Sequence, residues 1–333
     1  MSATTRVHIT IDTEFSIAGA FADPARRRPV GAQAVYCRIG EASYGLGYLL
    51  DTFARYGVKA TFFVEALNTD YFGDEPMGEI ARRLHAAGHD VQLHLHPCWT
   101  YFRQADWQTR LKASPPNDDI TRRSEDEVVG LIEAGVAAFV RWGVPAPTVL
   151  RTGGLKANLA VYRAMRRCGM RVASNLGLAV FRPREPQLQL YSGRHDVEGV
   201  VEIPVTTFSD LRLPGRTHYK TLTITGASWG ETRSVLARAH LAGVSDVVVL
   251  THAFEYVKHR DVTYEKLYPD RINRARLARL CEFLTTTPGF QASTLGGLGA
   301  VAPAAGNHLV SVPLLQAAGR MLVNRINHSI MRF

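Results

Sequence analysis

Short segments in which hydrophobic and polar residues alternate recur along the chain and predict β-strands. These predicted strands are residues 6–11, 58–64, 91–95, 149–150, 170–175, 200–204 and 246–250. Hydrophobic residues between them recur at the spacing of amphipathic helices, at residues 44–56, 76–87, 125–140, 159–168, 232–241 and 271–284. Because strands and helices alternate, this order predicts parallel strands joined by helical crossovers, which is an α/β fold.

Two histidines stand at the end of the third predicted strand. Side chains two residues apart in a strand point to the same face, so His94 and His96 can share one metal ion. Alone, an H-x-H pair is weak support for a metal site, because a single histidine more often lies in a core or on a surface. The residues that follow other strands decide its meaning.

Ionisable residues also follow three other predicted strands. Asp12 and Glu14 follow the first strand and share one face by the same geometry. Arg151 follows the fourth predicted strand, and His252 follows the last one. In parallel α/β folds the carboxyl ends of the strands lie on one side, which hosts the chemistry. The sequence therefore predicts a single site built from two acids, three histidines and an arginine.

A site of two histidines and one carboxylate suits a divalent metal ion. Such a donor set leaves open positions for water and for an amide oxygen. The ion lowers the pKa of the water and stabilises the oxyanion of a tetrahedral intermediate. Zinc is the ion that we expect.

Five short motifs resemble, in the same order, those of the polysaccharide deacetylase (NodB-homology) superfamily. They are residues 10–14 (Thr-Ile-Asp-Thr-Glu), 59–64 (Lys-Ala-Thr-Phe-Phe-Val), 88–90 (Gly-His-Asp) with the histidines beyond, 150–151 (Leu-Arg) and 250–252 (Leu-Thr-His). The resemblance covers roughly residues 6–255. It implies a distorted (β/α) barrel that removes acetyl groups from N-acetylated sugars with the help of a divalent metal.

The resemblance implies a role for each of these residues. Asp12 corresponds to the catalytic base, and Glu14 corresponds to a metal ligand. His94 corresponds to the first metal histidine. Arg151 corresponds to the arginine that orients the base, and His252 corresponds to the general acid.

Two departures from the family pattern concern the metal site. The family's two acids are adjacent, but Thr13 separates Asp12 from Glu14, so the roles of base and ligand are open to exchange. The family's second metal histidine follows the first by four residues, where this chain has Cys98. Strand geometry favours His96 as the second histidine, with Cys98 as the alternative.

A third departure concerns the residues around the arginine and the general acid. The aromatic residue that follows the arginine motif in the family is replaced by Gly153 and Gly154. In addition, the sequence offers no clear carboxylate to orient His252.

The segment between residues 97 and 121 is aromatic and lacks periodicity. Its aromatic side chains are Trp99, Tyr101, Phe102 and Trp107. Aromatic faces pack well against sugar rings, so the segment could form the wall of a substrate cleft. The alternative is that these side chains only anchor the loop.

Composition restricts the class of protein. The chain has 333 residues, of which 46% are hydrophobic and 21% charged, as in soluble globular proteins with a sizeable core. The N-terminus lacks a leader pattern, and no apolar run is long enough to span a bilayer. The four cysteines form no C-x-x-C pair, which favours free thiols in a reducing compartment. We therefore expect a cytoplasmic protein.

The net charge of +9 favours an acidic partner, but no nucleic-acid motif accompanies it.

We expect a catalytic domain of the polysaccharide deacetylase type at residues 1–300 and an amphipathic, basic helical tail at residues 301–333. The hydrophobic residues on one side of this tail are Leu314, Leu315, Ala318, Met321, Leu322, Ile326 and Ile330, interleaved with Arg320, Arg325 and Arg332. The tail either docks on the domain or lies on the anionic inner face of the plasma membrane.

These features together predict a metal-dependent hydrolase. Its expected substrate is an N-acetylated sugar of a surface polysaccharide precursor, of the O-antigen or exopolysaccharide kind, either free or lipid-linked. One alternative is hydrolysis of a small non-sugar amide or ureide by the same metal site. The other is a glycan- or membrane-binding module whose catalytic site has decayed.

Overall fold

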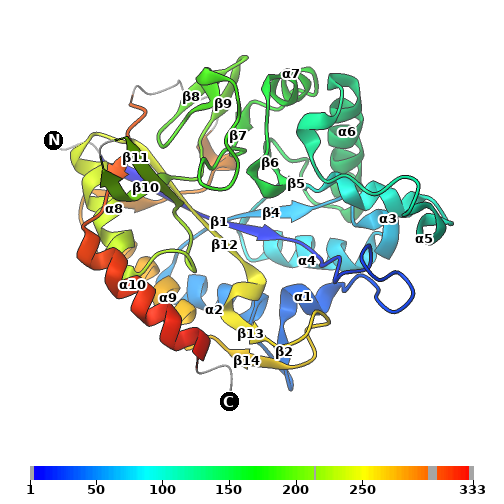
Figure 1. Ribbon diagram of the computed structural model, residues 1–333, viewed down its shortest axis with the longest axis horizontal. Coiled ribbons are helices and arrows are strands. Elements are labelled where there is room, and N and C mark those ends of the chain that lie inside the picture. The colour runs from blue at the N-terminus through cyan, green and yellow to red at the C-terminus, as the bar shows by residue number, and fades with distance from the viewer. Residues whose placement is uncertain (1–3, 214, 299–305, 330–333) are drawn as a thin grey trace.

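A curled, largely parallel sheet forms the centre of the molecule, and helices surround it (Figure 1). The computed structural model describes residues 4–213, 215–298 and 306–329. The strand order is β12-β1-β4-β5-β6-β7-β9-β8, and β15 pairs with β1 outside this path. Neighbouring strands are parallel except β8 and β9, which form an antiparallel pair. The predicted α/β fold with a distorted barrel is confirmed, and the sheet is an open half-barrel.

The strands of this sheet are short, as the sequence pattern predicted. Their bounds are β1 Thr5–Thr13, β4 Thr61–Glu65, β5 Asp90–Leu95, β6 Val149–Thr152, β7 Val172–Ala173, β8 His195–Val197, β9 Val200–Glu202, β12 Asp246–His252 and β15 Phe290–Ala292. The helices are α1 Ala32–Tyr36, α2 Leu46–Tyr56, α3 Thr69–Phe72, α4 Glu75–Ala86, α5 Trp107–Arg110, α6 Glu125–Trp142, α7 Leu159–Arg167, α8 Trp229–Leu241, α9 Arg271–Thr286 and α10 Leu314–Ser329.

Three smaller sheets lie beside the central one. They are formed by β10 Thr207–Leu213, β11 Arg216–Thr221 and β16 Val310–Ser311; by β13 Val257–His259 and β14 Leu267–Pro269; and by β2 Arg38–Ile39 and β3 Ala42–Ser43. Residues 180–218 are rich in proline and arginine, and besides the predicted strand at 200–204 they contain β8, β10 and the start of β11.

The register of the central strands brings the predicted site residues together. Asp12 on β1 pairs with His252 on β12, and His94 on β5 pairs with Arg151 on β6. Because the strands are parallel, all four residues lie at carboxyl ends on the same edge of the sheet. Both faces of these strands are covered, so every residue of β1 except Arg6 is buried.

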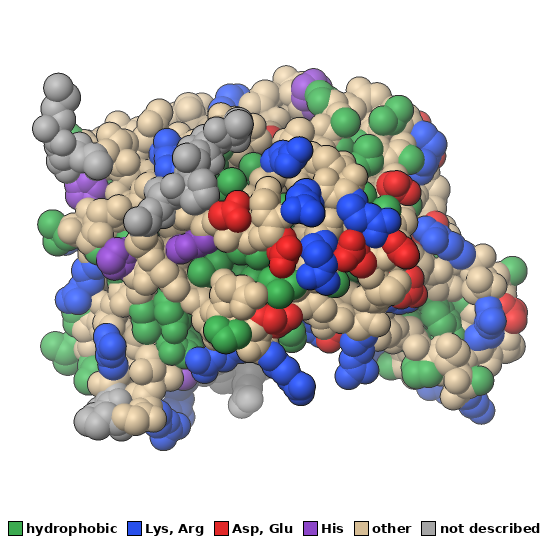
Figure 2. Space-filling view, turned by 90° about the horizontal axis from the view of Figure 1, so that it is seen from above, with side chains coloured by type: hydrophobic (Ala, Val, Ile, Leu, Met, Phe, Trp, Pro, Cys, Tyr) green, Lys and Arg blue, Asp and Glu red, His purple; other side chains and the backbone are tan. Residues whose placement is uncertain are grey.

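Helix α6 shows how local sequence fixes the helices around the sheet. Ser124 and Glu127 form a reciprocal capping box at its start, and Gly143 ends it in a left-handed conformation with φ of 72°. Basic and acidic side chains interleave near the middle of the upper face, where α6 and α7 lie (Figure 2). Ion pairs such as Arg163 to Glu125 and Arg167 to Asp126 join these two helices.

The C-terminal helix α10 packs against α8 and β10. Arg320 donates to Asp210 at 2.7 Å and to Glu231 at 2.9 Å, and the Asn324 amide oxygen accepts from Arg276 at 3.0 Å. The expected boundary at residue 300 lies outside the described residues, as do Ile330, Arg332 and the side chains of Leu322 and Ile326. Within the described part of the chain, no helix has both the length and the apolar character needed to cross a bilayer.

Candidate active site

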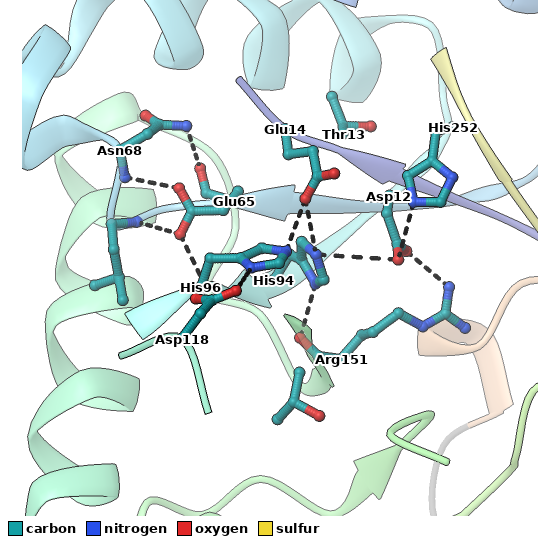
Figure 3. A network of polar contacts seen from close by, with 12 residues as sticks. Asp12, Thr13, Glu14, Glu65, Asn68, His94, His96, Asp118, Arg151 and His252 are labelled. Carbon is teal, nitrogen blue, oxygen red and sulfur yellow. Dashed lines mark hydrogen bonds and ion pairs between the residues drawn. The ribbon is translucent and has the colours of Figure 1, made fainter. Parts of the chain in front are cut away.

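Glu14, His94 and His96 converge at the carboxyl end of the sheet (Figure 3). The Glu14 carboxylate lies 3.4 Å from Nε2 of His94 and 2.8 Å from Nε2 of His96. One ligand atom from each residue lies within 4.8 Å of the other two. The Nδ1 atom of His94 donates to the Arg151 carbonyl oxygen at 2.9 Å, so its Nε2 keeps a free lone pair toward the site.

The charges in this group fit a bound cation. Burial raises the pKa of Glu14, but His96 and His94 outweigh this effect and hold it well below its usual value. Burial lowers the pKa of His96, but Glu14 and Asp118 raise it well above its usual value. His96 is therefore protonated and faces the Glu14 carboxylate. A divalent cation would take the place of this proton, because histidine binds metals in its neutral form. The donor set of one carboxylate and two imidazoles is one that zinc commonly takes.

Asp118 orients His96 and was not predicted from the sequence. Its carboxylate lies 2.6 Å from Nδ1 of His96 and also accepts the Cys98 backbone N–H at 3.1 Å. Carboxylates in this position direct the other imidazole nitrogen toward a metal. Asp118 lies in an irregular loop 22 residues after His96, and no spacing rule connects the two.

Cys98, the alternative ligand, belongs to a second possible group with His96 and Asp118. This group contains neither Glu14 nor His94, and its carboxylate already binds His96. Burial raises the pKa of the Cys98 thiol, which opposes the thiolate form that metals need.

Asp12 lies beside the possible metal group and is held by Arg151. Its Oδ1 accepts from Nη1 of Arg151 at 2.8 Å, and its Oδ2 is 4.0 Å from Nε2 of His94. Burial raises the pKa of Asp12, but the charges of Arg151 and the neighbouring histidines outweigh it and lower the pKa. Asp12 is therefore ionised and aimed into the site near neutral pH.

Arg151 is buried and fixed on every side. Its guanidinium donates to the Ser174 carbonyl and hydroxyl oxygens and to the Thr10 hydroxyl oxygen, at 2.7 to 3.0 Å. It also lies over the Phe63 ring, 4.2 Å from the centroid. Because these contacts leave it one orientation, Arg151 presents Asp12 with a fixed positive charge.

His252 stands on the opposite side of Asp12, with Nε2 3.9 Å from Oδ2. Its Nδ1 lies 3.1 Å from the Glu255 carboxylate, which also accepts from the Thr251 hydroxyl at 2.7 Å. Burial lowers the pKa of His252, but Glu255, Asp12 and Glu14 raise it to about 9. Glu255 is the orienting carboxylate that the sequence did not reveal. It follows His252 by three residues, in a 3-10 turn over Ala253–Tyr256 that bends back after β12.

Glu65 is a second buried acid that the sequence did not reveal. It ends β4, and its carboxylate accepts the backbone N–H groups of Leu67, Asn68 and His96 at 2.7 to 3.3 Å. Burial raises its pKa to about 8. Glu65 thus ties the chain after β4 to the start of the loop after β5, beside His96 (Figure 3).

Gly153 accounts for two of the departures from the family pattern together. A Cβ atom at this position would lie 2.5 Å from Cε1 and Nδ1 of the His96 ring. Real Cβ atoms do not approach other atoms so closely, so the side chain of His96 can occupy its place only beside glycine. The glycine after the arginine motif and the histidine at position 96 are therefore structurally coupled.

A pocket of about 250 Å³ opens at this group. Its lining includes Glu14, Phe15, Ser16, Ile17, His96, Cys98, Trp99, Asp118, Phe254 and Tyr264. Trp99 is the aromatic residue of segment 97–121 that reaches it. Phe102 and Trp107 are buried and pack on Phe21, at 5.1 and 6.3 Å between ring centroids, so they anchor the loop.

The chain resembles known proteins in sequence and in fold. Residues 45–173 match the family model described as Polysaccharide deacetylase. A Mycobacterium smegmatis protein assigned as a polysaccharide deacetylase is 14% identical with a TM-score of 0.55, over 92% of this chain and 95% of that chain. A family 4 carbohydrate esterase from Streptomyces lividans is 13% identical with a TM-score of 0.43, over 91% and 100% of the two chains. No curated protein sequence matches the chain.

The resemblance that the sequence motifs carry is thereby confirmed. Residues 45–173 therefore resemble polysaccharide deacetylases in sequence, and the Mycobacterium smegmatis structure shows the same fold over most of the chain. The matched residues run from the start of α2 to β7 and include both histidines and Arg151.

Proposed function

We propose that the chain removes an N-acetyl group from a sugar of a surface polysaccharide precursor. The observation that carries the proposal is the position of an ionised Asp12 between two histidines. One histidine belongs to the candidate metal group, and the other is protonated and can donate a proton. On one side lie Nε2 of His94 and the Glu14 carboxylate, and on the other lies a protonated His252. Amide hydrolysis needs a base, a charge stabiliser and an acid in this arrangement.

Glu14, His94 and His96 would hold the metal, which is zinc in our proposal. When bound there, a divalent ion makes water a stronger acid and withdraws charge from the amide carbonyl. In one of the solved structures that resemble this chain, an acetyl xylan esterase from Clostridium thermocellum, a cobalt ion is present.

The residues of this chain then supply the proton transfers. Asp12 takes a proton from the attacking water while the water oxygen forms a bond to the acetyl carbonyl carbon. Arg151 keeps Asp12 ionised and aligned through the 2.8 Å contact. His252 gives its Nε2 proton to the sugar nitrogen as the C–N bond breaks, which releases acetate and a free amine. Glu255 holds the ring of His252 in place during this step.

The experiment that tests this proposal measures acetate release from N-acetylglucosamine oligomers with zinc present. We expect wild-type protein to release acetate and Asp12→Asn to be at least about 100-fold slower, because a positioned base contributes about 100- to 10,000-fold. Asp51→Asn, an exposed carboxylate on α2, is the matched control and should behave as wild type. Equal rates for Asp12→Asn and wild type would contradict the proposal.

Two further measurements separate the alternatives. Activity on small amides or ureides, without activity on glycans, would favour a non-sugar substrate. A metal content well below one ion per chain that added zinc does not restore would favour a decayed binding module.

We also propose that α10 brings the enzyme to an anionic membrane surface from the cytoplasm, where a lipid-linked precursor would lie. The helix docks through the side that carries Arg320, Asn324 and the buried Ala317. The opposite side leaves Leu314, Leu315 and Met321 exposed by 60%, 86% and 58%. A docked helix with its apolar side outward has the amphipathic form of an interfacial helix. The net charge of +9 complements anionic lipids and disfavours a second copy of the chain as the occupant.

A further inference from the structure

A second pocket, of about 400 Å³, lies in the segment between β5 and α6. The proposed chemistry makes no use of it. Its lining consists of Thr100, Tyr101, Gln104, Arg110, Ser114, Pro115, Pro116, Asn117, Arg122, Arg123 and Glu127. Three arginines and one glutamate are therefore among the residues that line this pocket.

The carboxylate does not neutralise the three arginines. One oxygen of Glu127 accepts the Ser124 backbone N–H at 2.7 Å in the cap of α6, and the other lies 3.7 Å from Nη1 of Arg123. In the part of the chain that the structure describes, the guanidinium groups of Arg110 and Arg122 form no ion pair. The pocket therefore carries an excess of positive charge.

Two polar atoms of the lining are buried without a hydrogen-bond partner among the described residues. They are Nε of Arg123 and the hydroxyl oxygen of Tyr101. Buried donors nearly always have an acceptor, so these two need a partner that the described residues do not supply, such as a bound anion or an ordered water. Both atoms can donate, as an anion requires.

The same stretch of chain forms a wall of both pockets. Cys98 and Trp99 line the active-site pocket, while Thr100 and Tyr101, the next residues, line the second one. Likewise Asp118 contacts His96, while its neighbour Asn117 lines the second pocket and its carbonyl accepts from Nη2 of Arg123 at 3.3 Å. Neighbouring residues of one stretch therefore line both pockets, which makes the second pocket a candidate for a part of the substrate beyond the reacting amide.

We propose that this second pocket is a subsite for an oxyanion carried by the glycan substrate, either a phosphate or a carboxylate. The proposal rests on the proposed function for the identity of the ligand, but its chemistry rests on the pocket alone. Arginine binds both groups through paired N–H donors, so a sugar phosphate and a uronic acid residue are both suitable sources. The enzyme would then select acidic glycans over neutral ones.

Binding is tested first, without turnover, by isothermal titration of the full chain with inorganic pyrophosphate and with glucuronate. We expect at least one probe to bind, and the probe that binds identifies the source of the anion. Arg110→Gln and Arg122→Gln should each weaken that binding at least tenfold. Tyr101→Phe, which removes only the unpartnered hydroxyl, should weaken it as well.

Lys112→Gln is the matched control, because it removes one exposed positive charge in the same loop without lining the pocket. It should leave binding unchanged. Thermal unfolding of each variant checks that the loop still folds. Absence of binding to both probes, or equal loss in Lys112→Gln, would overturn the subsite.

Kinetics connect the subsite to catalysis. With acidic N-acetylated oligosaccharides, Arg122→Gln should raise KM at least tenfold with little change in kcat, and with neutral oligosaccharides it should change neither. An equal effect on neutral substrate would overturn the subsite. If wild-type protein binds pyrophosphate but hydrolyses none of the N-acetylated substrates, the proposed function is contradicted while the anion site is supported.

Discussion

Asp12 and His252 lie on neighbouring strands and are held in opposite protonation states. Arg151 and the histidines lower the pKa of Asp12, whereas Glu255, Asp12 and Glu14 raise the pKa of His252 to about 9. Near neutral pH the carboxylate can therefore accept a proton while the imidazolium can donate one. Environments that separate the pKa values of neighbouring groups in this way define the acid and the base of an active site.

Glu255→Gln tests the origin of the raised pKa. A general acid is active while protonated, so the rate should fall as the pH rises through the pKa of His252. Removing the negative charge of Glu255 lowers that pKa, and the alkaline limb of the pH profile of kcat should move to lower pH. Glu255→Asp keeps the negative charge, so its alkaline limb should lie between those of wild type and Glu255→Gln. An alkaline limb at the same pH in all three proteins would show that Glu255 does not control His252.

Gly153→Ala tests the coupling between the glycine and His96. The new Cβ would lie 2.5 Å from the imidazole, so His96 must rotate away from Glu14. We expect zinc affinity, measured by competition with a chromophoric chelator, to fall about tenfold or more, as when a metal histidine loses its orientation. Gly130→Ala on α6 is the control, because a Cβ there meets nothing within 4 Å. Unchanged zinc affinity in Gly153→Ala would argue against His96 as a ligand.

The sequence identified residues at strand ends but not their supporting partners. Asp12, His94 and His252 could be found because strand geometry and parallel order fix where they lie. Asp118 and Glu255 could not, because Asp118 lies in irregular backbone and Glu255 in a short 3-10 turn, and tertiary packing sets the direction of both. The role of a short polar segment is set by the residues that it folds against.

At the scale of elements, the chain between residues 180 and 218 shows the same limit. Prolines and arginines hide the alternation that marks a strand, yet this stretch contains β10, which pairs with β11 and β16. The helices were predictable because caps and glycines mark their ends. Ser124 begins α6, and Gly57 ends α2 in a left-handed conformation with φ of 63°.

Helix α10 carries the prediction about membranes. Leu314→Gln with Leu315→Gln should reduce sedimentation with vesicles of phosphatidylglycerol and phosphatidylcholine, because it removes exposed apolar area. Hydrolysis of soluble substrate should stay within about twofold of wild type, since the change lies outside the site. Val140→Gln, a 64% exposed residue on α6, is the control. Unchanged vesicle binding in the double variant would show that the helix packs on the domain and does not bind the membrane.

Substitution is a cleaner test than truncation of this helix. Arg320 binds Asp210 and Glu231, whose side chains are only 6% and 0% exposed. Its removal would leave the buried Glu231 without an ion-pair partner and Asp210 paired only with His218, and breaking a buried ion pair typically costs about 3–5 kcal/mol. A truncated chain would therefore lose stability together with membrane contact.

At the scale of the whole molecule, the site exists only because distant segments meet. Asp12 on β1 and His252 on β12 are 240 residues apart in the sequence and pair directly. His94 on β5 and Arg151 on β6 pair in the same way. The half-barrel gathers these strand ends at one edge, so the fold and the arrangement of the acids and histidines are inseparable. The class of fold could be predicted from the order of elements alone, since strands and helices alternate regularly.

The central claim is that Glu14, His94 and His96 share one metal ion beside Asp12. Anomalous X-ray diffraction at the zinc absorption edge, on crystals grown with zinc, tests it most directly. The account predicts a single strong peak bounded by the Glu14 carboxylate and the Nε2 atoms of both histidines. A peak at Cys98 and Asp118 instead, or no peak near Glu14, would contradict it.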